Sequence, residues 1–424
     1  MENSDLRTIT QCRSCGFKNL ESIFSLGDLF VSNFIDGTEK FDFKRYPLEL
    51  VLCNAKSGGC GLLQLRDTVS NEIMYRNYWY RSGANQTMTS ALSEIAQTAG
   101  IIRPVNSSDY VIDIGCNDGT LIRAYSIKGL KKIGFEPARN LVPVAELSAF
   151  KVINDFFNKE VWEKEFPGKK AKIITAIAMF YDLDNPNKFI ADIVHCLDED
   201  GIFIIQMSYL PLMLSQNAFD NICHEHLEYY SLFSLENLLK RHGLEVFDVG
   251  LNDVNGGSFR IFIKHQNSGA GIEKNPGADE RVRNLRNSEN KLGLNDRKVY
   301  ADFAFRVSDI KTRTLQFIRE ENSKGKKIYI YGASTKGNTL LQFYGIDSSM
   351  VPFAAERSQS KWGKKTIGSL ISIISEEQAR NDHPDYFLVL PWHFMKEFLN
   401  RESQFLARGG KFIIPLPELK VINS

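Results

Sequence analysis

The stretch YVIDIGCNDG at residues 110–119 predicts the fold of the middle of the chain. Its first five residues form an apolar strand interrupted only by Asp113, and Gly115 and Gly119 frame a tight turn into a helix. Glycines suit such a turn because the backbone approaches a ligand closely and adopts positive φ. The next strand ends in Glu136, a position from which a carboxylate accepts hydrogen bonds from both hydroxyls of a ribose.

Details of the turn separate two nucleoside ligands. The pattern is D-x-G-x-x-x-G instead of the G-x-G-x-x-G of dinucleotide-binding proteins. The Asp113 carboxylate suits a cationic sulfonium and its ammonium group better than it suits a phosphate. The pattern resembles motif I of class I methyltransferases, which bind S-adenosylmethionine (SAM); a purely structural turn is the alternative. The cofactor residues predicted from this turn and the next strand are Asp113, Gly115, Asn117, Gly119 and Glu136. After the third strand come Asn154, Asp155 and Phe156, which in this fold are placed to meet the adenine, with core packing as the alternative for Phe156.

Composition limits the class of protein. The chain has 424 residues, too many for one core, with 43% hydrophobic and 24% charged residues. The 52 basic and 51 acidic residues argue against nucleic-acid or membrane binding by bulk charge. Apolar runs fall short of the ~20 residues that span a bilayer, and the N-terminus lacks the apolar core of a signal peptide. We predict a cytoplasmic protein.

Four segments follow one another along the chain. Residues 1–70 carry four of the seven cysteines and short strand patterns. Residues 71–265 alternate strand and helix patterns, which is typical of a parallel sheet with crossover helices. Residues 266–280 are rich in Gly, Asn and charge and read as a linker. Residues 281–424 begin with a polar helical stretch and end with a second strand, glycine-rich turn and helix. The predicted fold class is therefore α/β.

The cysteines near the N-terminus form two pairs, Cys12 with Cys15 and Cys53 with Cys60. In a cytosolic chain they do not suggest a disulfide framework. Four thiolates suit a structural tetrahedral zinc ion, which has no open coordination position and hence no catalytic role. Free buried cysteines are the alternative.

The segment DNICHEHLEYYS at residues 220–231 is dense in groups that transfer protons. His224 and His226 point to one side and Glu225 to the other if the segment is extended, whereas a loop lets all three line one pocket. Neutral histidine removes a proton at working pH, so we favour general-base chemistry. The alternatives are satisfied buried histidines and half of a metal site.

A second glycine-rich turn follows the strand KKIYIYG near the C-terminus. The backbone amides from Gly332, the start of the next helix and the Lys336 ammonium suit a phosphate, with Ser334 beside them. The P-loop pattern is absent, so ATP is not expected. Arg357 and Lys361 after the next strand are placed to neutralise a diphosphate, or else form an ordinary solvated basic stretch.

These segments together resemble the sugar C-methyltransferases that act on nucleotide-linked deoxy-keto-sugars. The resemblance covers essentially the whole chain, and its most specific parts are the His-Glu-His segment and the G-A-S-x-K-G turn. Weaker matches are CRSCG from Cys12, SLGD from Ser25, CGLLQL from Cys60, NGGSFR from Asn255 and GGKFIIPLP from Gly409.

The resemblance implies three domains: a small zinc module, a class I methyltransferase Rossmann-like domain, and a C-terminal Rossmann-like domain that helps to hold a sugar nucleotide. It implies that His226 is the base that removes a proton from a carbon next to a carbonyl, with Glu225 as its catalytic partner. The enolate then attacks the SAM methyl group. Tyr78 and Tyr80, together with Tyr75, match a tyrosine-rich stretch of the family's active site; packing at a domain joint is the alternative for at least one of them.

Three features depart from the family. Cys223 replaces a tyrosine that commonly precedes His-Glu-His. Residues 54–59 lengthen the second cysteine pair, which is usually C-x-x-C. Residues 179–184, MFYDLD, replace a polar stretch that normally borders both SAM and substrate. The substrate is therefore the least secure part of the resemblance.

We predict a SAM-dependent C-methyltransferase with a nucleotide-linked keto-sugar as substrate, and with SAM and structural zinc as cofactors. Transfer to a sugar oxygen or a nitrogen is one alternative, and a catalytically silent SAM- or sugar-nucleotide-binding protein is another. Neither a nucleic acid nor a membrane is expected as a partner, and the oligomeric state stays open.

Overall fold

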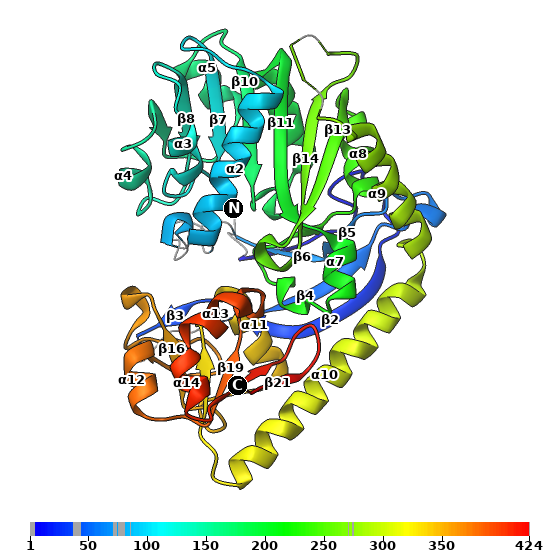
Figure 1. Ribbon diagram of the computed structural model, residues 1–424. Coiled ribbons are helices and arrows are strands. Elements are labelled where there is room, and N and C mark those ends of the chain that lie inside the picture. Colours follow the sequence, from blue (N-terminus) through cyan, green and yellow to red (C-terminus); the bar gives the residue numbers. More distant parts are fainter. Residues whose placement is uncertain are drawn as a thin grey trace.

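The computed structural model describes residues 5–36, 44–70, 74, 81–84, 86–269, 271–273 and 275–423. Two large sheets lie one above the other, and the strands of the N-terminal segment run between them (Figure 1). No helix in these ranges is both long enough and apolar enough to cross a membrane.

The upper sheet has seven strands in the order β13-β14-β11-β10-β7-β8-β9. From β7 the chain builds β8 and β9 on one side, then returns to place β10 and β11 on the other. Ligands bind at such a reversal, beyond the carboxyl ends of the two central strands. Only β14 runs antiparallel to its neighbours in this sheet. The strands are β7 (Tyr110–Ile114), β8 (Lys131–Phe135), β9 (Lys151–Ile153), β10 (Ala171–Ile177), β11 (Leu197–Ser208), β13 (Leu244–Asn252) and β14 (Ser258–His265).

Helices cover both faces of this sheet, which explains why most of β10 and residues 201–207 of β11 are buried. The core between helices and sheet includes Ile112, Ile174 and Phe203, each at most 1% exposed. The associated helices are α2 (Gln86–Ile102), α3 (Thr120–Ala124), α4 (Val142–Ala145), α5 (Lys159–Glu165), α6 (Pro186–Cys196), α7 (Leu210–Ser215) and α8 (Leu232–Lys240).

The lower sheet has eight strands in the order β21-β20-β19-β15-β16-β18-β17-β3. Here too the first central strand, β15, has its successors on both sides, so a second reversal lies between β15 and β19. The elements are β15 (Ile328–Tyr331), α11 (Thr335–Tyr344), β16 (Phe353–Glu356), β17 (Lys365–Thr366), β18 (Ser372–Ser375), α12 (Glu376–Asn381), β19 (Tyr386–Val389), α13 (Met395–Arg401), α14 (Ser403–Ala407), β20 (Lys411–Ile414) and β21 (Lys420–Ile422).

The N-terminal segment is joined to both large domains. Its own sheet has the order β12-β5-β4-β2, and β12 lies within residues 220–231, which contain His-Glu-His. Its strand β3 instead completes the edge of the lower sheet by pairing with β17. The strands are β1 (Leu6–Thr8), β2 (Glu21–Phe30), β3 (Phe34–Ile35), β4 (Arg45–Leu52), β5 (Leu63–Leu65), β6 (Asp67–Val69) and β12 (Glu228–Tyr229).

Two helices connect the large domains. Helix α9 (Ala278–Leu292) begins inside the stretch predicted as a linker, and α10 (Arg297–Ser323) runs down to the lower domain (Figure 1). The polar sequence of α9 hides a buried anchor, Glu289, which is 4% exposed. Its carboxylate accepts hydrogen bonds from the amides of Leu232 and Phe233 at the start of α8, and from the hydroxyl of Tyr209. A carboxylate at a helix N-terminus satisfies amides that have no partner within the helix.

Candidate active site

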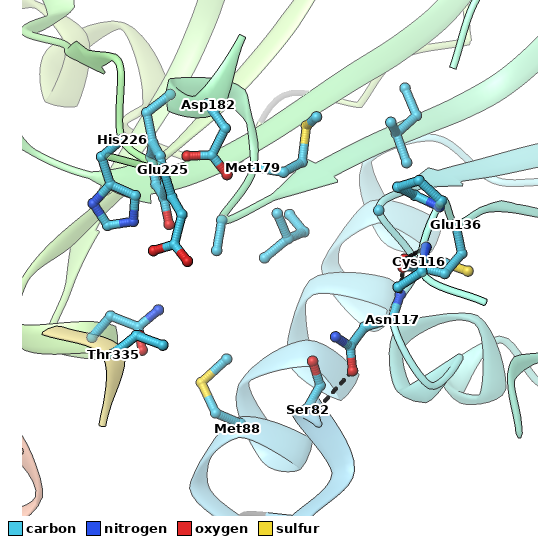
Figure 2. A pocket seen from close by; sticks show the side chains of 18 of the residues that line it. Ser82, Met88, Cys116, Asn117, Glu136, Met179, Asp182, Glu225, His226 and Thr335 are labelled. Atoms are coloured by element: carbon cyan, nitrogen blue, oxygen red, sulfur yellow. Dashed lines mark hydrogen bonds between the residues drawn. The ribbon is translucent and has the colours of Figure 1, made fainter. Parts of the chain in front are cut away.

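A cavity of about 370 Å³ connects the two sheet reversals. One wall is formed by Cys116 and Asn117 in the turn after β7 and by Glu136, the residue after β8 (Figure 2). The opposite wall carries Glu225 and His226, with Thr335 of the lower domain close by.

The turn after β7 has the predicted geometry. Gly115 and Gly119 have φ of +68° and +75°, and α3 begins at the next residue, Thr120. A Cβ on Gly119 would lie 3.0 Å from the Cα of Ala145, so a larger residue would push the turn away from α4. Asn117 also has positive φ, and its Oδ1 accepts hydrogen bonds from the amides of Ser82 and Asp118.

Two carboxylates line the cavity at this turn, and both have protein partners. Glu136 accepts hydrogen bonds of 2.8 Å from the amides of Asn117 and Ala138. Asp113 accepts one of 2.6 Å from the Thr175 hydroxyl. Burial raises the pKa of Glu136 and raises that of Asp113 to about 7. Each carboxylate is therefore held in place and retains lone pairs for a ligand.

The remaining predicted cofactor residues divide into two groups. Asp155 and Phe156 line the cavity. Asn154 instead donates a hydrogen bond of 2.8 Å to the carbonyl of Glu136, and Gly119 shapes the turn without lining the cavity. The neighbouring Phe157 packs edge-to-face against Phe135 and Phe189, as a core residue does.

These residues fit SAM. Glu136 lies where a ribose diol needs an acceptor, and Asp113 offers a carboxylate to the cationic end of the ligand. Met179 and Leu183 supply apolar surface along the same cavity. A Cβ on Gly115 would come within 3.4 Å of the Met179 side chain, so the glycine keeps this part of the cavity open.

The opposite wall contains His226. Its Nδ1 lies 2.7 Å from the carbonyl oxygen of Asn221. Because a carbonyl only accepts, Nδ1 carries the proton in the neutral ring and Nε2 holds the lone pair. The ring of Tyr181 contacts the His226 ring edge-to-face at 4.3 Å. Burial, together with the charge of Lys336, lowers the pKa of His226 to about 3, so the ring is neutral at physiological pH.

Glu225 and His224 have different surroundings. Glu225 lines the cavity and accepts a contact of 3.6 Å from the Cys223 thiol, and burial raises its pKa to about 7. His224 is 4% exposed, and its Nε2 donates a hydrogen bond of 3.0 Å to the carbonyl of Tyr46 in β4. His224 is not among the described residues that line the cavity, so its position matches the alternative of a satisfied buried histidine.

Three further acids line the cavity and were not singled out from the sequence: Asp182, Asp184 and Asp220. Asp182 ends η3 (Phe180–Asp182), and Asp220 lies in η4 (Phe219–Asn221). Oδ1 of Asp182 and Oδ1 of Asp220 are buried without a hydrogen-bond partner in the described part of the chain. Oδ2 of Asp220 accepts a hydrogen bond of 3.2 Å from the indole N–H of Trp392. An acid within the otherwise apolar run MFYDL was the available signal for Asp182.

The lower domain contributes the start of α11. Ser334 caps this helix by accepting a hydrogen bond from the Gly337 amide, and it lines the cavity with Lys336. The Lys336 ammonium donates a hydrogen bond of 2.6 Å to Oδ1 of Asn221, the residue whose carbonyl orients His226. This contact connects the second glycine-rich turn to the His-Glu-His segment.

Other predicted substrate residues lie outside the cavity lining. The Lys361 ammonium donates a hydrogen bond of 2.7 Å to the carbonyl of Ala333, and the guanidinium of Arg357 lies 3.6 Å from the carboxylate of Glu397. Gly332, with φ of +85°, shapes the turn; a Cβ there would lie 2.6 Å from the ring of Pro391. The tyrosines predicted at the active site, Tyr75, Tyr78 and Tyr80, are outside the described residues.

The four N-terminal cysteines form a metal site. Their sulfur atoms all lie within 4.8 Å of one another, with Cys12 to Cys60 at 3.7 Å and Cys15 to Cys53 at 3.4 Å. Zinc–sulfur bonds of 2.3 Å in a tetrahedron place sulfurs about 3.8 Å apart, so the cluster fits zinc.

The lengthened knuckle between Cys53 and Cys60 contains the short helix η1 (Ala55–Ser57), capped by Asn54. Gly59 follows it because a Cβ there would lie 2.6 Å from the sulfur of Cys53. The longer loop thus returns the second cysteine to the metal, and the predicted zinc site is confirmed.

Fold and site together define a class I SAM-dependent methyltransferase with a structural zinc site. Three family models match consecutive parts of the chain: a zinc binding domain (residues 12–75), a methyltransferase domain (80–249) and a C-methyltransferase C-terminal domain (253–417). The C-methyltransferase NovU of Streptomyces niveus is 30% identical over 422 residues, which cover 99% of this chain and 98% of the relative. The chain belongs to the SAM-dependent C-methyltransferases.

Solved structures of two methyltransferases each resemble less than half of the chain. A SAM-dependent methyltransferase from Clostridium acetobutylicum is 13% identical, with a TM-score of 0.34, over 42% of this chain and 92% of its own. The methyltransferase CcbJ from Streptomyces caelestis is 9% identical, with a TM-score of 0.33, over 42% and 90%.

Proposed function

We propose that this C-methyltransferase acts on a nucleotide-linked keto-deoxysugar and that His226 is its general base. One observation carries the proposal. The imidazole whose proton sits on Nδ1, and whose Nε2 therefore holds the lone pair, lines the cavity that also reaches Glu136 and the start of α11.

A carbon next to a carbonyl loses its proton only to a well-placed base, and the enolate oxygen must be stabilised. Nε2 of His226 takes this proton, and the carbonyl of Asn221 accepts from Nδ1 before and after the transfer. This hydrogen bond fixes the orientation of the ring and stabilises the imidazolium that forms. SAM, when bound, supplies an electrophilic methyl group. Glu136, on the wall opposite His226, and Asp113, which lines the same cavity, would hold it.

The lower domain supports a phosphorylated substrate. Helix α11 begins at the cavity with Ser334 and Lys336, and a helix start with a lysine attracts phosphate. The Lys336 charge is one cause of the lowered pKa of His226. A diphosphate beside Lys336 offsets that charge and raises the basicity of His226, so the base becomes stronger when the substrate binds.

Methyl-transfer assays test the function. The purified protein is incubated with SAM and a panel of thymidine- and uridine-diphosphate-linked 4-keto-6-deoxyhexoses, with the corresponding 4-hydroxy sugars as matched controls. We expect a new carbon–carbon methyl signal in the NMR spectrum of a keto product and none with the controls, which cannot form an enolate. A methyl ether as product, or equal turnover of the 4-hydroxy sugars, would contradict the proposal.

A further inference from the structure

The oxygen of the proposed enolate needs a hydrogen-bond donor close to His226. Several donors in the described part of this wall are engaged with protein acceptors. The Lys336 ammonium contacts Oδ1 of Asn221 at 2.6 Å and the carbonyl of Asn255 at 3.4 Å. Nδ1 of His226 donates to Asn221, and the Cys223 thiol points to Glu225.

Asp182 has the opposite surroundings. Strand β10 ends at Ile177, and the next residue, Ala178, has φ of +55°, a sharp turn that directs η3 into the cavity. Within η3, the ring of Tyr181 rests on the His226 ring, and the next residue is Asp182. Figure 2 shows the Asp182 carboxyl next to Glu225, on the same wall as His226. Its side chain has no hydrogen-bond partner among the described residues, and its Oδ1 is buried.

We propose that Asp182 is a protonated carboxylic acid that donates a hydrogen bond to the carbonyl oxygen of the substrate and stabilises the enolate. This inference rests on the proposed function, because it names the group that assists the same proton transfer. An acid kept neutral by its surroundings is able to act as an oxyanion donor where a carboxylate is not.

The charges around Asp182 favour its protonated form. Glu225 from the His-Glu-His segment and Glu228 on β12 both act on it with like charge. Burial is the largest cause, and together these effects hold the pKa of Asp182 well above its usual range. The positive charge of Arg13 acts on Glu228, whereas the charged groups of the described chain that act on Asp182 itself are the acids Glu225 and Glu228.

The proton balance is simple. The C–H proton passes to Nε2 of His226, and its electron pair becomes the enolate. With SAM bound, its methyl carbon would form the new carbon–carbon bond with that enolate as the methyl–sulfur bond breaks, and S-adenosylhomocysteine would leave with the electron pair. The carbonyl is then restored, and the imidazolium releases its proton to solvent. Asp182 keeps its own proton throughout and lowers the energy of the negative oxygen only.

Deuterium exchange isolates this step from methyl transfer. The keto-sugar nucleotide that the wild-type protein turns over is incubated in D₂O with each variant and S-adenosylhomocysteine, and deuterium at the carbon next to the carbonyl is followed by NMR. We expect Asp182→Ala to slow exchange about 10²–10³-fold, as loss of an oxyanion donor does. Asp182→Asn keeps an N–H donor and should retain more of the rate. Asp198→Asn, which removes an acid paired with Lys172 at the start of β11, is the matched control.

The pH dependence separates a donor from a structural residue. In the wild type, exchange should fall as the pH rises through the pKa of Asp182, because the donor proton is lost. In Asp182→Asn the amide does not titrate, so this decline should flatten. Zinc content and S-adenosylhomocysteine binding show that each variant is folded.

Two results would overturn the inference: exchange by Asp182→Ala within about twofold of the wild type, or Asp182→Asn as slow as Asp182→Ala with an unchanged decline at high pH. A wild-type protein that binds S-adenosylhomocysteine but neither exchanges nor methylates any keto-sugar of the panel would instead overturn the proposed function, and the inference with it.

Discussion

The two walls of the cavity are built in different ways. At the turn after β7, the carboxylates of Asp113 and Glu136 accept hydrogen bonds from their own domain. On the opposite wall, Asp182 and Asp220 each have a buried oxygen without a partner in the described residues. The carboxylates of the first wall have hydrogen-bond partners within the protein, whereas the second wall has buried oxygens to which a substrate could hydrogen-bond. Unsatisfied buried groups of this kind gather at functional sites.

The walls also differ in where their support comes from. The turn after β7 depends on one sheet and its helices. The His-Glu-His segment depends on all three parts of the chain: β12 pairs with β5 of the zinc-binding segment, and Lys336 of the lower domain holds Asn221. Damage outside the central domain should therefore affect chemistry more than SAM binding.

Removal of zinc should have the largest effect on turnover and should leave cofactor binding in place. Zinc binding contributes about 10–16 kcal/mol to folding in zinc-finger peptides, and here the metal site supports the sheet that pairs with β12. We expect Cys53→Ser to lose zinc and to have no measurable turnover, while S-adenosylhomocysteine binding by calorimetry persists. Cys196→Ser, a buried cysteine outside the cluster, is the control. A zinc-free protein with normal turnover would contradict the structural role.

Loss of the base comes next in size. His226→Ala should lower turnover ~10²–10⁴-fold, the range for a lost general base, with SAM affinity close to the wild-type value. Steady-state kinetics and calorimetry measure the two quantities separately. His224→Asn, which changes a histidine turned toward β4, should alter turnover far less if the variant folds. Equal losses in both variants would show that the segment acts through its fold alone.

The same contrast explains what could be predicted from the sequence. The turn after β7 is local: ten consecutive residues and one strand end place Gly115, Asn117 and Glu136, so the pattern predicted the strand, the turn and the helix start at Thr120. The four-cysteine site was also predictable, because two short-range pairs need only come together.

The other wall depends on contacts between distant parts of the chain. No local pattern indicates that His224 turns toward Tyr46, nor that Ala178 adopts positive φ and brings Asp182 into the cavity. The pairing of β3 with β17, about 330 residues apart in sequence, is equally invisible to patterns within a window of residues. Residue types indicated the chemistry of this wall, whereas tertiary contacts decided which of them line it.

Substitution of Glu136 tests the wall at the turn after β7, where the carboxylates already have protein partners. Gln offers only one acceptor to the two amides that the carboxylate now satisfies, and it loses the charge. Hydrogen bonds to charged groups contribute about 1.5–3 kcal/mol, so Glu136→Gln should weaken SAM binding ~10–100-fold. Calorimetry with S-adenosylhomocysteine measures this, with Glu146→Gln on the nearby surface as control. Unchanged affinity would remove Glu136 from the cofactor site.

The smallest effect, on the KM for the sugar nucleotide, is expected for Arg357, which does not line the cavity. Lys336→Met should raise the KM for the sugar nucleotide about tenfold, because its ammonium lies at the cavity and charged hydrogen bonds are lost. Arg357→Ala should change KM less than about twofold, since the guanidinium faces Glu397 and a half-exposed pair of this kind contributes ~0–1 kcal/mol. Titration of both variants with the same substrate makes the comparison direct. A larger effect from Arg357→Ala than from Lys336→Met would mean that the diphosphate lies on the outer side of β16, and the phosphate assignment would move from the start of α11 to that strand end.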